Sequence, residues 1–348
     1  MRIRHRMAFG LTMTAALLWP AAGTATSATA ATFTQLPAHV YAPYYETYLA
    51  PNTPSISATA QQSGARYFTL AFLQSTGKNS CTLAWNGNSA QPLGYYAADI
   101  AALRAAGGDV IPSFGGFSAD QGGTEIADSC TSVSQIAADY ESVITTLGVT
   151  RLDMDVEARS LNNTAGIDRR NKAIAMTQAW AASQGIPLQV QYTIPVEQYG
   201  LDPNGEAVLQ NAGANGATVN SVNIMVFDYY IAGEGTVNMG QAAINAATNT
   251  HAQLATIYPN LTSAQIWNSE AMTLLPGIDD YPKKTEVTHL ADAQTMLNFA
   301  QANSMNLLSI WAIQRDNGGC PGTRDSNTCS GIVQNTWDFS HLLEPFTG

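Results

Sequence analysis

Short apolar segments alternate with longer amphipathic segments along most of the chain. The short segments are rich in β-branched and aromatic residues and are apolar on both faces, which is typical of buried parallel strands. We predict eight strands, at Val40–Tyr45, Arg66–Leu73, Asp109–Phe114, Arg151–Glu157, Leu188–Ile194, Val222–Tyr229, Gln265–Glu270 and Leu307–Ile313. Apolar residues with helical spacing fill the segments between them, as at Tyr95–Ala106, Val133–Leu147, Ile167–Gln184, Met239–Ile257 and Leu290–Asn303.

This alternation predicts an α/β fold, a (β/α)8 TIM barrel in a single domain. The alternative is an open doubly wound sheet. It is disfavoured because no glycine-rich phosphate-binding turn follows the first predicted strand.

The first 31 residues have a different character. Three arginines within the first six residues precede an apolar run from Met7 to about Trp19, and small residues continue to Ala31. A basic head, a short apolar middle and Ala-rich cleavage sites are typical of a secretory signal peptide. We therefore predict a signal at 1–31, a catalytic barrel at 32–348, and a secreted, extracellular protein.

The charge balance limits the possible partners. The chain has 15 Lys and Arg against 26 Asp and Glu, a formal net charge of −11. Such a protein repels nucleic acids and anionic membranes, so we expect neither as a partner. The five histidines are scattered and do not form a metal-binding pattern. We expect an uncharged substrate, a monomer, and no cofactor or metal.

All four cysteines lie in the predicted exported part, where two disulfides are the default. Three pairings are possible by arithmetic. Cys320 and Cys329 flank a loop of Gly, Pro, Asp and Asn, which favours a local bridge and leaves Cys81 with Cys130. A four-cysteine zinc site is disfavoured because no C-x-x-C pair is present.

Three acidic residues lie within the fourth predicted strand. Asp153, Asp155 and Glu157 alternate with apolar residues, which places their side chains on one side of the strand. Burial of clustered carboxylates raises the pKa of at least one of them, as a general acid requires. A solvated edge strand or a metal site are the alternatives, but no histidine lies nearby to support a metal.

Four motifs in order along the strands resemble those of glycoside hydrolase family 18, especially its secreted bacterial chitinases. The family's S-x-G-G is similar to Ser113–Gly116, and its D-x-x-D-x-D-x-E is matched from Asp153 onward. A sixth-strand M-x-Y-D motif resembles Met225–Asp228, and an eighth-strand tryptophan resembles Trp311. The resemblance extends over nearly all of the chain after the signal.

The resemblance implies substrate-assisted hydrolysis with retention of configuration. Glu157 would protonate the glycosidic oxygen while the acetamide oxygen of the substrate attacks the anomeric carbon. Asp155 would orient the acetamide, with Asp153 behind it sharing a proton, and Glu157 would then act as base for water. This chemistry requires an N-acetyl group on the sugar, so the implied substrates are chitin or chitooligosaccharides.

Two positions depart from the family pattern. Thr150 replaces the first acid of the fourth-strand motif, at a position that we expect to be remote from the bond broken. Phe227 replaces a tyrosine whose hydroxyl would hold the acetamide oxygen. Strict alternation places Tyr229 on the same strand face as Met225 and Phe227, so Tyr229 is the candidate to supply that hydroxyl.

The remaining candidates are substrate-binding residues. Trp311 would floor the pocket beneath a sugar ring, and Trp85 could line an outer sugar subsite. Asp280 resembles a family position that contacts substrate, with Asp279 as a rival. The full candidate substrate-binding set is Met225, Asp228, Tyr229, Trp311, Asp280, Ser113 and Gly116, although Ser113 and Gly116 fit better as residues that shape the backbone beside the acids.

The sequence therefore predicts a chitinase. One alternative is an endo-β-N-acetylglucosaminidase acting on N-glycans, which would use the same acids. The other is a non-catalytic chitin-binding lectin, which the presence of Glu157 disfavours.

Overall fold

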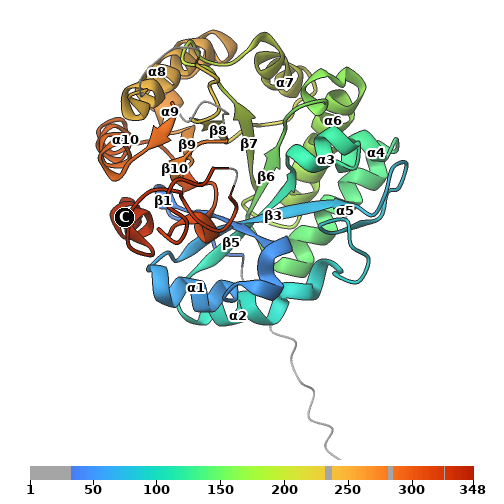
Figure 1. The fold of residues 1–348 in the computed structure, drawn as a ribbon. Coiled ribbons are helices and arrows are strands. Elements are labelled where there is room, and N and C mark those ends of the chain that lie inside the picture. The colour runs from blue at the N-terminus through green and yellow to red at the C-terminus, as the bar shows by residue number, and fades with distance from the viewer. Residues whose placement is uncertain (1–32, 232–236, 281–284, 325) are drawn as a thin grey trace, which may run out of the picture. The chain divides into compact units, whose positions relative to one another are not determined.

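Eight parallel strands form the centre of the molecule in a computed structural model that describes residues 33–231, 237–280, 285–324 and 326–348. Helices surround the strands (Figure 1). The first strand is built from two pieces, β1 (Val40–Tyr41) and β2 (Tyr44–Glu46). The others are β3 (Tyr67–Ser75), β5 (Asp109–Gly115), β6 (Arg151–Asp155), β7 (Gln189–Pro195), β8 (Ser221–Met225), β9 (Glu270–Leu274) and β12 (Leu307–Ile310).

The two pieces of the first strand close the barrel. β1 pairs in parallel with the last strand β12, and β2 pairs in parallel with β3. The change of partner occurs around Pro43, which has no N–H to donate to a ladder but whose carbonyl accepts from Thr69 (3.0 Å). The remaining strands pair in chain order, so the prediction of a TIM barrel is confirmed.

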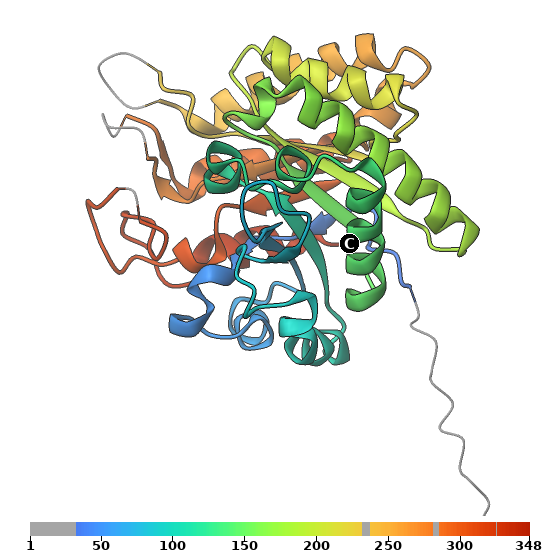
Figure 2. The same ribbon diagram turned by 90° about the vertical axis from the view of Figure 1, so that its right-hand side faces the viewer.

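The helices lie on the outside of the strands, as Figure 2 shows for those drawn in green and yellow. Most begin with a side-chain cap, and several end in a residue of left-handed conformation. Ser132, for example, caps the start of α5, and Gly148 ends that helix in the left-handed conformation. The helices are α1 (Ile56–Ser63), α2 (Ala97–Ala105), α3 (Phe117–Gly122), α4 (Ile126–Ser129), α5 (Val133–Leu147), α6 (Thr164–Ser183), α7 (Pro203–Ala214), α8 (Met239–Ile257), α9 (Ser263–Trp267), α10 (Leu290–Asn303) and α11 (Asp338–Leu343).

The seventh strand lies later in the chain than the sequence predicted. The segment predicted as a strand at Gln265–Glu270 begins in α9, and β9 starts only at Glu270. A capping box explains the difference: the Thr262 side chain accepts from the Gln265 backbone N–H, and the Gln265 side chain accepts from the Thr262 N–H. This reciprocal pair satisfies two backbone donors and starts a helix. Five further helices, α1, α3, α4, α7 and α11, lie outside the helical segments that the sequence analysis names.

Both disulfides form as expected. Cys81 is bonded to Cys130 and Cys320 to Cys329, with Cα–Cα distances of 4.7 and 6.0 Å. The predicted signal at 1–31 lies outside the described residues. No described helix has both the length and the apolar character needed to span a membrane.

A buried ion pair joins the helices α4 and α6. Arg170 on α6 lies 2.8 Å from Glu125, and both side chains are essentially inaccessible to solvent. Glu125 also accepts from the N–H groups of Ala127 and Asp128 at the start of α4. Because a buried charge without its partner is strongly unfavourable, the pair ties α4 to α6.

We expect Arg170→Met to lower the free energy of unfolding by about 3–5 kcal/mol, because it leaves Glu125 buried and unpaired. The control is Lys172→Met on the same helix, which breaks an exposed pair with Asp168 and should change that free energy by less than about 1 kcal/mol. Denaturant unfolding followed by circular dichroism measures both. Equal effects of the two substitutions on the free energy of unfolding would contradict a stabilising role for the buried pair of Arg170 and Glu125.

Candidate active site

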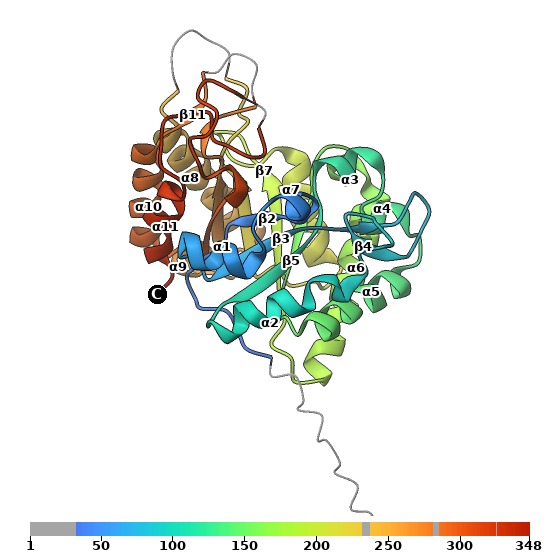
Figure 3. The same ribbon diagram turned by 60° about the horizontal axis from the view of Figure 1, so that its bottom comes forward.

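A cavity of about 730 Å³ opens at the carboxyl ends of the barrel strands. In a TIM barrel this end carries the catalytic residues. Figure 3 shows the loops around β11 (Val287–Thr288) projecting beyond the helices at one end of the molecule. The lining is a mixture of carboxylates and aromatic rings that includes Tyr44, Tyr48, Phe72, Phe117, Asp155, Glu157, Glu197, Asp202, Met225, Phe227, Asp228, Tyr230, Asp280 and Trp311.

Asp153 is the innermost of the three acids on β6 and is fully buried. Four side chains donate hydrogen bonds to its carboxylate: Tyr44 (2.8 Å), Ser113 (2.6 Å), Gln191 (3.0 Å) and Thr193 (2.7 Å). Burial raises the pKa of Asp153, and these hydrogen bonds oppose that rise. Since four donors favour the ionised form, we place the negative charge of the group on Asp153.

Asp155 has the opposite surroundings. Its side chain lines the cavity, and its Oδ1 atom is buried with no hydrogen-bond partner. Burial raises the pKa of Asp155 well above its ordinary value, and the negative charges of Glu157, Asp153 and Asp120 raise it further. The proton shared within this group therefore resides mainly on Asp155 or on its neighbour Glu157.

Glu157 follows the end of β6 and also lines the cavity. Burial raises the pKa of Glu157 to about 7, although a hydrogen bond from the Phe117 backbone N–H lowers it in part. Its own backbone N–H donates to Asp120 (2.5 Å). A carboxyl group with a pKa near neutrality can both donate a proton and take it back.

The S-x-G-G segment shapes the backbone beside these acids. Gly115 and Gly116 both have positive φ angles, +97° and +80°. A Cβ atom on Gly115 would lie 2.2 Å from the Asp155 carbonyl oxygen, and one on Gly116 would lie 2.5 Å from the Phe72 ring. Ser113 is buried and bonded to Asp153. Neither Ser113 nor Gly116 lines the cavity, so their placement as substrate-binding residues is corrected to a supporting position.

The end of β8 differs from the sequence-based expectation. Met225, Phe227 and Asp228 line the cavity, but Tyr229 is buried and Tyr230 takes its place. The strand stops at Met225, and positive φ angles at Asp228 (+54°) and Tyr230 (+52°) break the alternation. The expectation that Tyr229 presents its hydroxyl to the cavity is therefore corrected.

A second group of carboxylates, Asp228, Asp279 and Asp280, follows the strands β8 and β9. The Asp228 backbone N–H donates to buried Asp279 (2.9 Å), and Asp280 lines the cavity with Arg315 3.6 Å away. Burial raises the pKa of Asp228 well above its ordinary value, and a hydrogen bond with Asp279 raises it further. Asp280 thus faces the cavity, while Asp279 supports the chain beneath it.

Aromatic side chains form the floor and the mouth of the cavity. Trp311 lines it, and its ring stacks on Phe72 with centroids 5.5 Å apart and planes inclined by 20°. Phe117 and Tyr230 are largely exposed, at 61% and 59%. Trp85, considered above for an outer subsite, is fully buried and donates to the Leu93 carbonyl (3.0 Å), so it packs its own loop instead.

Thr150 precedes β6, at the end of the strand opposite the cavity. Its hydroxyl donates to the Thr34 carbonyl (2.9 Å). The position of the missing first acid of the family pattern therefore lies outside the cavity.

Two parts of the site could not be found from the sequence. Tyr44, Gln191 and Thr193 come from other strands and converge on Asp153 only when the barrel closes. Asp120 lies on α3 outside every motif, and its contact with Glu157 spans 37 residues.

Comparison with known proteins shows that this chain is similar to chitinases. No family model matches the chain. It is 35% identical over 323 residues to a probable bifunctional chitinase/lysozyme of Escherichia coli (strain K12), covering 89% of this chain and 35% of that protein. It is 34% identical over 287 residues to Endochitinase 11 of Metarhizium anisopliae, covering 80% and 53%. The chain thus spans about a third to a half of the length of these curated relatives.

Two of the solved structures that resemble this protein are also chitinases. The catalytic domain of a hyperthermophilic chitinase from Pyrococcus furiosus superposes with a TM-score of 0.77 and 28% identity, over 90% of this chain and 96% of that one. A family 18 chitinase from Pseudoalteromonas aurantia, at a TM-score of 0.51 and 14% identity over 80% and 96%, shares the fold. The matched motifs, the closed barrel and the chitinase relatives together support the resemblance to glycoside hydrolase family 18, and the family 18 structure shares the fold of this chain.

Proposed function

We propose that this protein is a chitinase, which hydrolyses β-1,4 bonds between N-acetylglucosamine units. The observation that carries the proposal is the pairing of Glu157 with Asp155 at the cavity wall. Glu157 is an acid with a pKa of about 7, and Asp155 has a buried oxygen that lacks a hydrogen-bond partner. The names of the relatives, chitinase in each case, support the substrate class.

The proposed reaction uses the substrate's own acetamide. The Asp155 carboxyl binds the acetamide N–H, the donor that its Oδ1 atom lacks, and turns the acetamide oxygen toward the anomeric carbon. As that oxygen attacks, the C1–O bond breaks and Glu157 donates its proton to the departing oxygen. The bound sugar becomes an oxazolinium ion, whose positive charge is stabilised by the carboxylates on β6. Glu157 then removes a proton from water, which attacks C1 and restores the acetamide with retained configuration.

The cavity lining suits a neutral sugar polymer. Trp311 and Phe227 offer apolar faces inside the cavity, and Phe117 and Tyr230 offer them at its mouth. Sugar rings bind such faces through their C–H surfaces. With Phe227 in place of a tyrosine, we propose that Tyr230, which lines the cavity beside Asp228, contacts the sugar instead of Tyr229. We also propose that the protein is exported, because disulfides such as its two persist in oxidising compartments outside the cytosol. We further propose that it acts as a monomer.

Incubation with N-acetylchitooligosaccharides of increasing length tests the proposal, with product sizing and anomer analysis. We expect shorter oligomers whose new reducing ends are initially β-anomers. Release of glycans from a glycoprotein with no cleavage of chitotetraose would favour the endo-β-N-acetylglucosaminidase alternative. Binding to chitin without any hydrolysis would favour a lectin. The name of the Escherichia coli relative also includes a lysozyme. Incubation of this protein with peptidoglycan tests whether it has that activity as well.

The pH dependence follows from the raised pKa of Glu157. A general acid must be protonated, so kcat/KM should fall as pH rises through about 7, where Glu157 loses its proton. An unperturbed glutamate would place this decline near pH 4. Initial rates on chitotetraose between about pH 4 and pH 9 measure it. A rate that stays constant through pH 8 would exclude Glu157 as the acid.

A further inference from the structure

We propose that Asp120 is a positioning residue for Glu157, which fixes the backbone of the acid from behind. The proposal rests on the function proposed above. It begins from one contact: the Asp120 carboxylate accepts a hydrogen bond from the Glu157 backbone N–H at 2.5 Å. Glu157 lies two residues after the end of β6, beyond Val156, whose N–H still donates to Thr193 on β7 (2.9 Å). Asp120 therefore supplies an acceptor that a neighbouring strand does not.

Helix α3 holds Glu157 at both ends. The Phe117 N–H, at the first residue of α3, hydrogen bonds to the Glu157 carboxyl group, and Asp120 on the next turn binds the Glu157 N–H. α3 is itself fixed to β6, because the Gly116 N–H donates to the Asp155 carbonyl (3.2 Å) and the Asp120 N–H donates to the Gly116 carbonyl (3.0 Å). A shift of α3 would thus move the acid.

Asp120 is buried at a cost that a purely structural contact does not explain. Its side chain is 0% exposed, and its Oδ1 atom has no hydrogen-bond partner. Burying such a group costs free energy, and a neutral asparagine could accept the same hydrogen bond from Glu157 at a lower cost. An aspartic acid at this position therefore differs from an asparagine in one respect: it can exchange a proton with the neighbouring carboxyl groups.

The charges around Asp120 connect it with the two catalytic acids. Burial raises the pKa of Asp120 well above its ordinary value, the charges of Glu125 and Glu157 raise it further, and Arg170 opposes them. Asp120 in turn raises the pKa of Asp155. Carboxyl groups that interact this strongly lose their protons as a set, so Asp120 helps to retain a proton on the Asp155–Glu157 pair at neutral pH.

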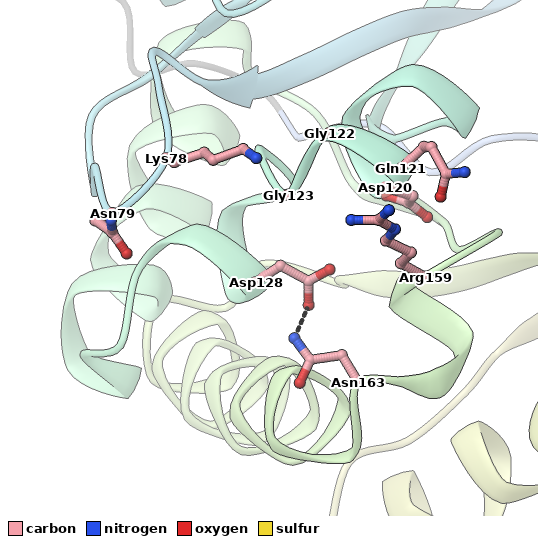
Figure 4. A pocket seen from close by; sticks show the side chains of 9 residues that line it. All are labelled: Lys78, Asn79, Asp120, Gln121, Gly122, Gly123, Asp128, Arg159 and Asn163. Carbon is pink, nitrogen blue, oxygen red and sulfur yellow. Dashed lines mark hydrogen bonds between the residues drawn. The ribbon is translucent and has the colours of Figure 1, made fainter.

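Asp120 also lines a second cavity. Its volume is about 280 Å³, and Figure 4 shows Arg159 and Lys78 among its other lining residues. Asp128, the remaining acid of this lining, hydrogen bonds to Asn163 (2.8 Å). Asp120 thus lines this polar cavity and also contacts the backbone of Glu157, which lines the substrate cavity.

Two substitutions separate the hydrogen bond of Asp120 from its charge. Asp120→Asn retains an acceptor for the Glu157 N–H and removes the charge, whereas Asp120→Ala removes both. The matched control is Asp139→Asn on α5, a half-buried carboxyl group that hydrogen bonds to Gln135 and lies outside both cavities. Each variant is assayed on chitotetraose across the pH range. The Glu157 pKa is measured in parallel by 13C-carboxyl NMR titration.

We expect Asp120→Asn to lower kcat by roughly 10-fold with KM changed by less than about 2-fold, because positioning acts on the reacting geometry and not on binding. The alkaline limb of the pH profile, and the Glu157 titration, should both move to lower pH. Asp120→Ala should lower kcat by roughly 100-fold, so that asparagine restores part of the loss. Asp139→Asn should change none of these quantities.

Unchanged kcat, pH profile and Glu157 titration in Asp120→Asn would overturn the proposal. A folded Asp120→Ala variant with wild-type kcat would do the same. The NMR titration does not depend on hydrolysis. If the wild-type protein does not cleave chitooligosaccharides, the proposed function fails. The NMR titration still tests the coupling in that case: a lower Glu157 pKa in Asp120→Asn would support it, and an unchanged Glu157 pKa would contradict it.

Discussion

Replacing Glu157 with Gln is expected to lower kcat on chitotetraose by roughly 10²–10⁴-fold, the range typical of a lost general acid. Glutamine has the same shape and can still accept the hydrogen bond from the Phe117 N–H. It cannot release a proton to the departing sugar or take one from water. Because the side chain is only partly exposed and a neutral amide is less costly to hold there than a carboxylate, Tm should stay the same or rise slightly.

Glu141→Gln provides the control for this experiment. Glu141 lies on α5 and outside the substrate cavity, so its replacement removes an equal charge without touching the site. Its kcat should match that of the wild-type protein. Turnover of the Glu157→Gln variant within a few-fold of wild type would show that another residue is the acid.

Replacing Asp155 with Asn should lower kcat by roughly 10²–10³-fold, because asparagine cannot give up a proton to become the carboxylate that stabilises the developing oxazolinium ion. Asparagine can still accept a hydrogen bond from the acetamide N–H, so KM should change much less than kcat. Steady-state kinetics on chitotetraose measure both quantities.

Asp155→Asn should also change the pH dependence of the rate, which provides a second test of the role of Asp155. The charges of Glu157 and Asp155 repel each other, so a neutral residue at 155 should let Glu157 lose its proton at lower pH. The alkaline limb should therefore move to lower pH in Asp155→Asn. A large loss of kcat with no change in the pH profile would be inconsistent with the shared proton.

The barrel and its catalytic strand were predictable because their signal is local. Asp153, Asp155 and Glu157 alternate with apolar residues, and the period of two gives the strand and its polar face together. The pairing of β6 with β5 then brings Ser113 to Asp153 in register. The position of Thr150 away from the cavity follows from the same strand geometry.

The errors arose where a strand ends. Alternation carried past Met225 would put Tyr229 in the cavity, but the backbone turns at Asp228 and brings Tyr230 there instead. Asp228 and Tyr230 adopt positive φ angles that few residues favour, so no residue-type pattern indicates the turn. At Gln265 the apolar run resembled a strand, yet the capping box with Thr262 starts a helix.

Asp120 shows what tertiary structure alone can provide. Its position on a single turn of helix after Gly116 has no periodicity or motif of its own. It becomes significant only because β5 and β6 are neighbours and deliver α3 to the end of β6. The same holds for Tyr44, which reaches Asp153 from the first strand.

The divided first strand has a consequence for how the molecule assembles. Val40 pairs with Leu307, so the seam of the barrel joins segments 267 residues apart, while β2 on the other side of Pro43 is already paired with β3 nearby in the chain. During synthesis the early strands can associate, but both free edges stay exposed until β12 arrives. Closing so long a loop is slow, and unpaired edges attract other chains. Any truncation ahead of Leu307 should therefore yield an aggregating product and not a smaller enzyme.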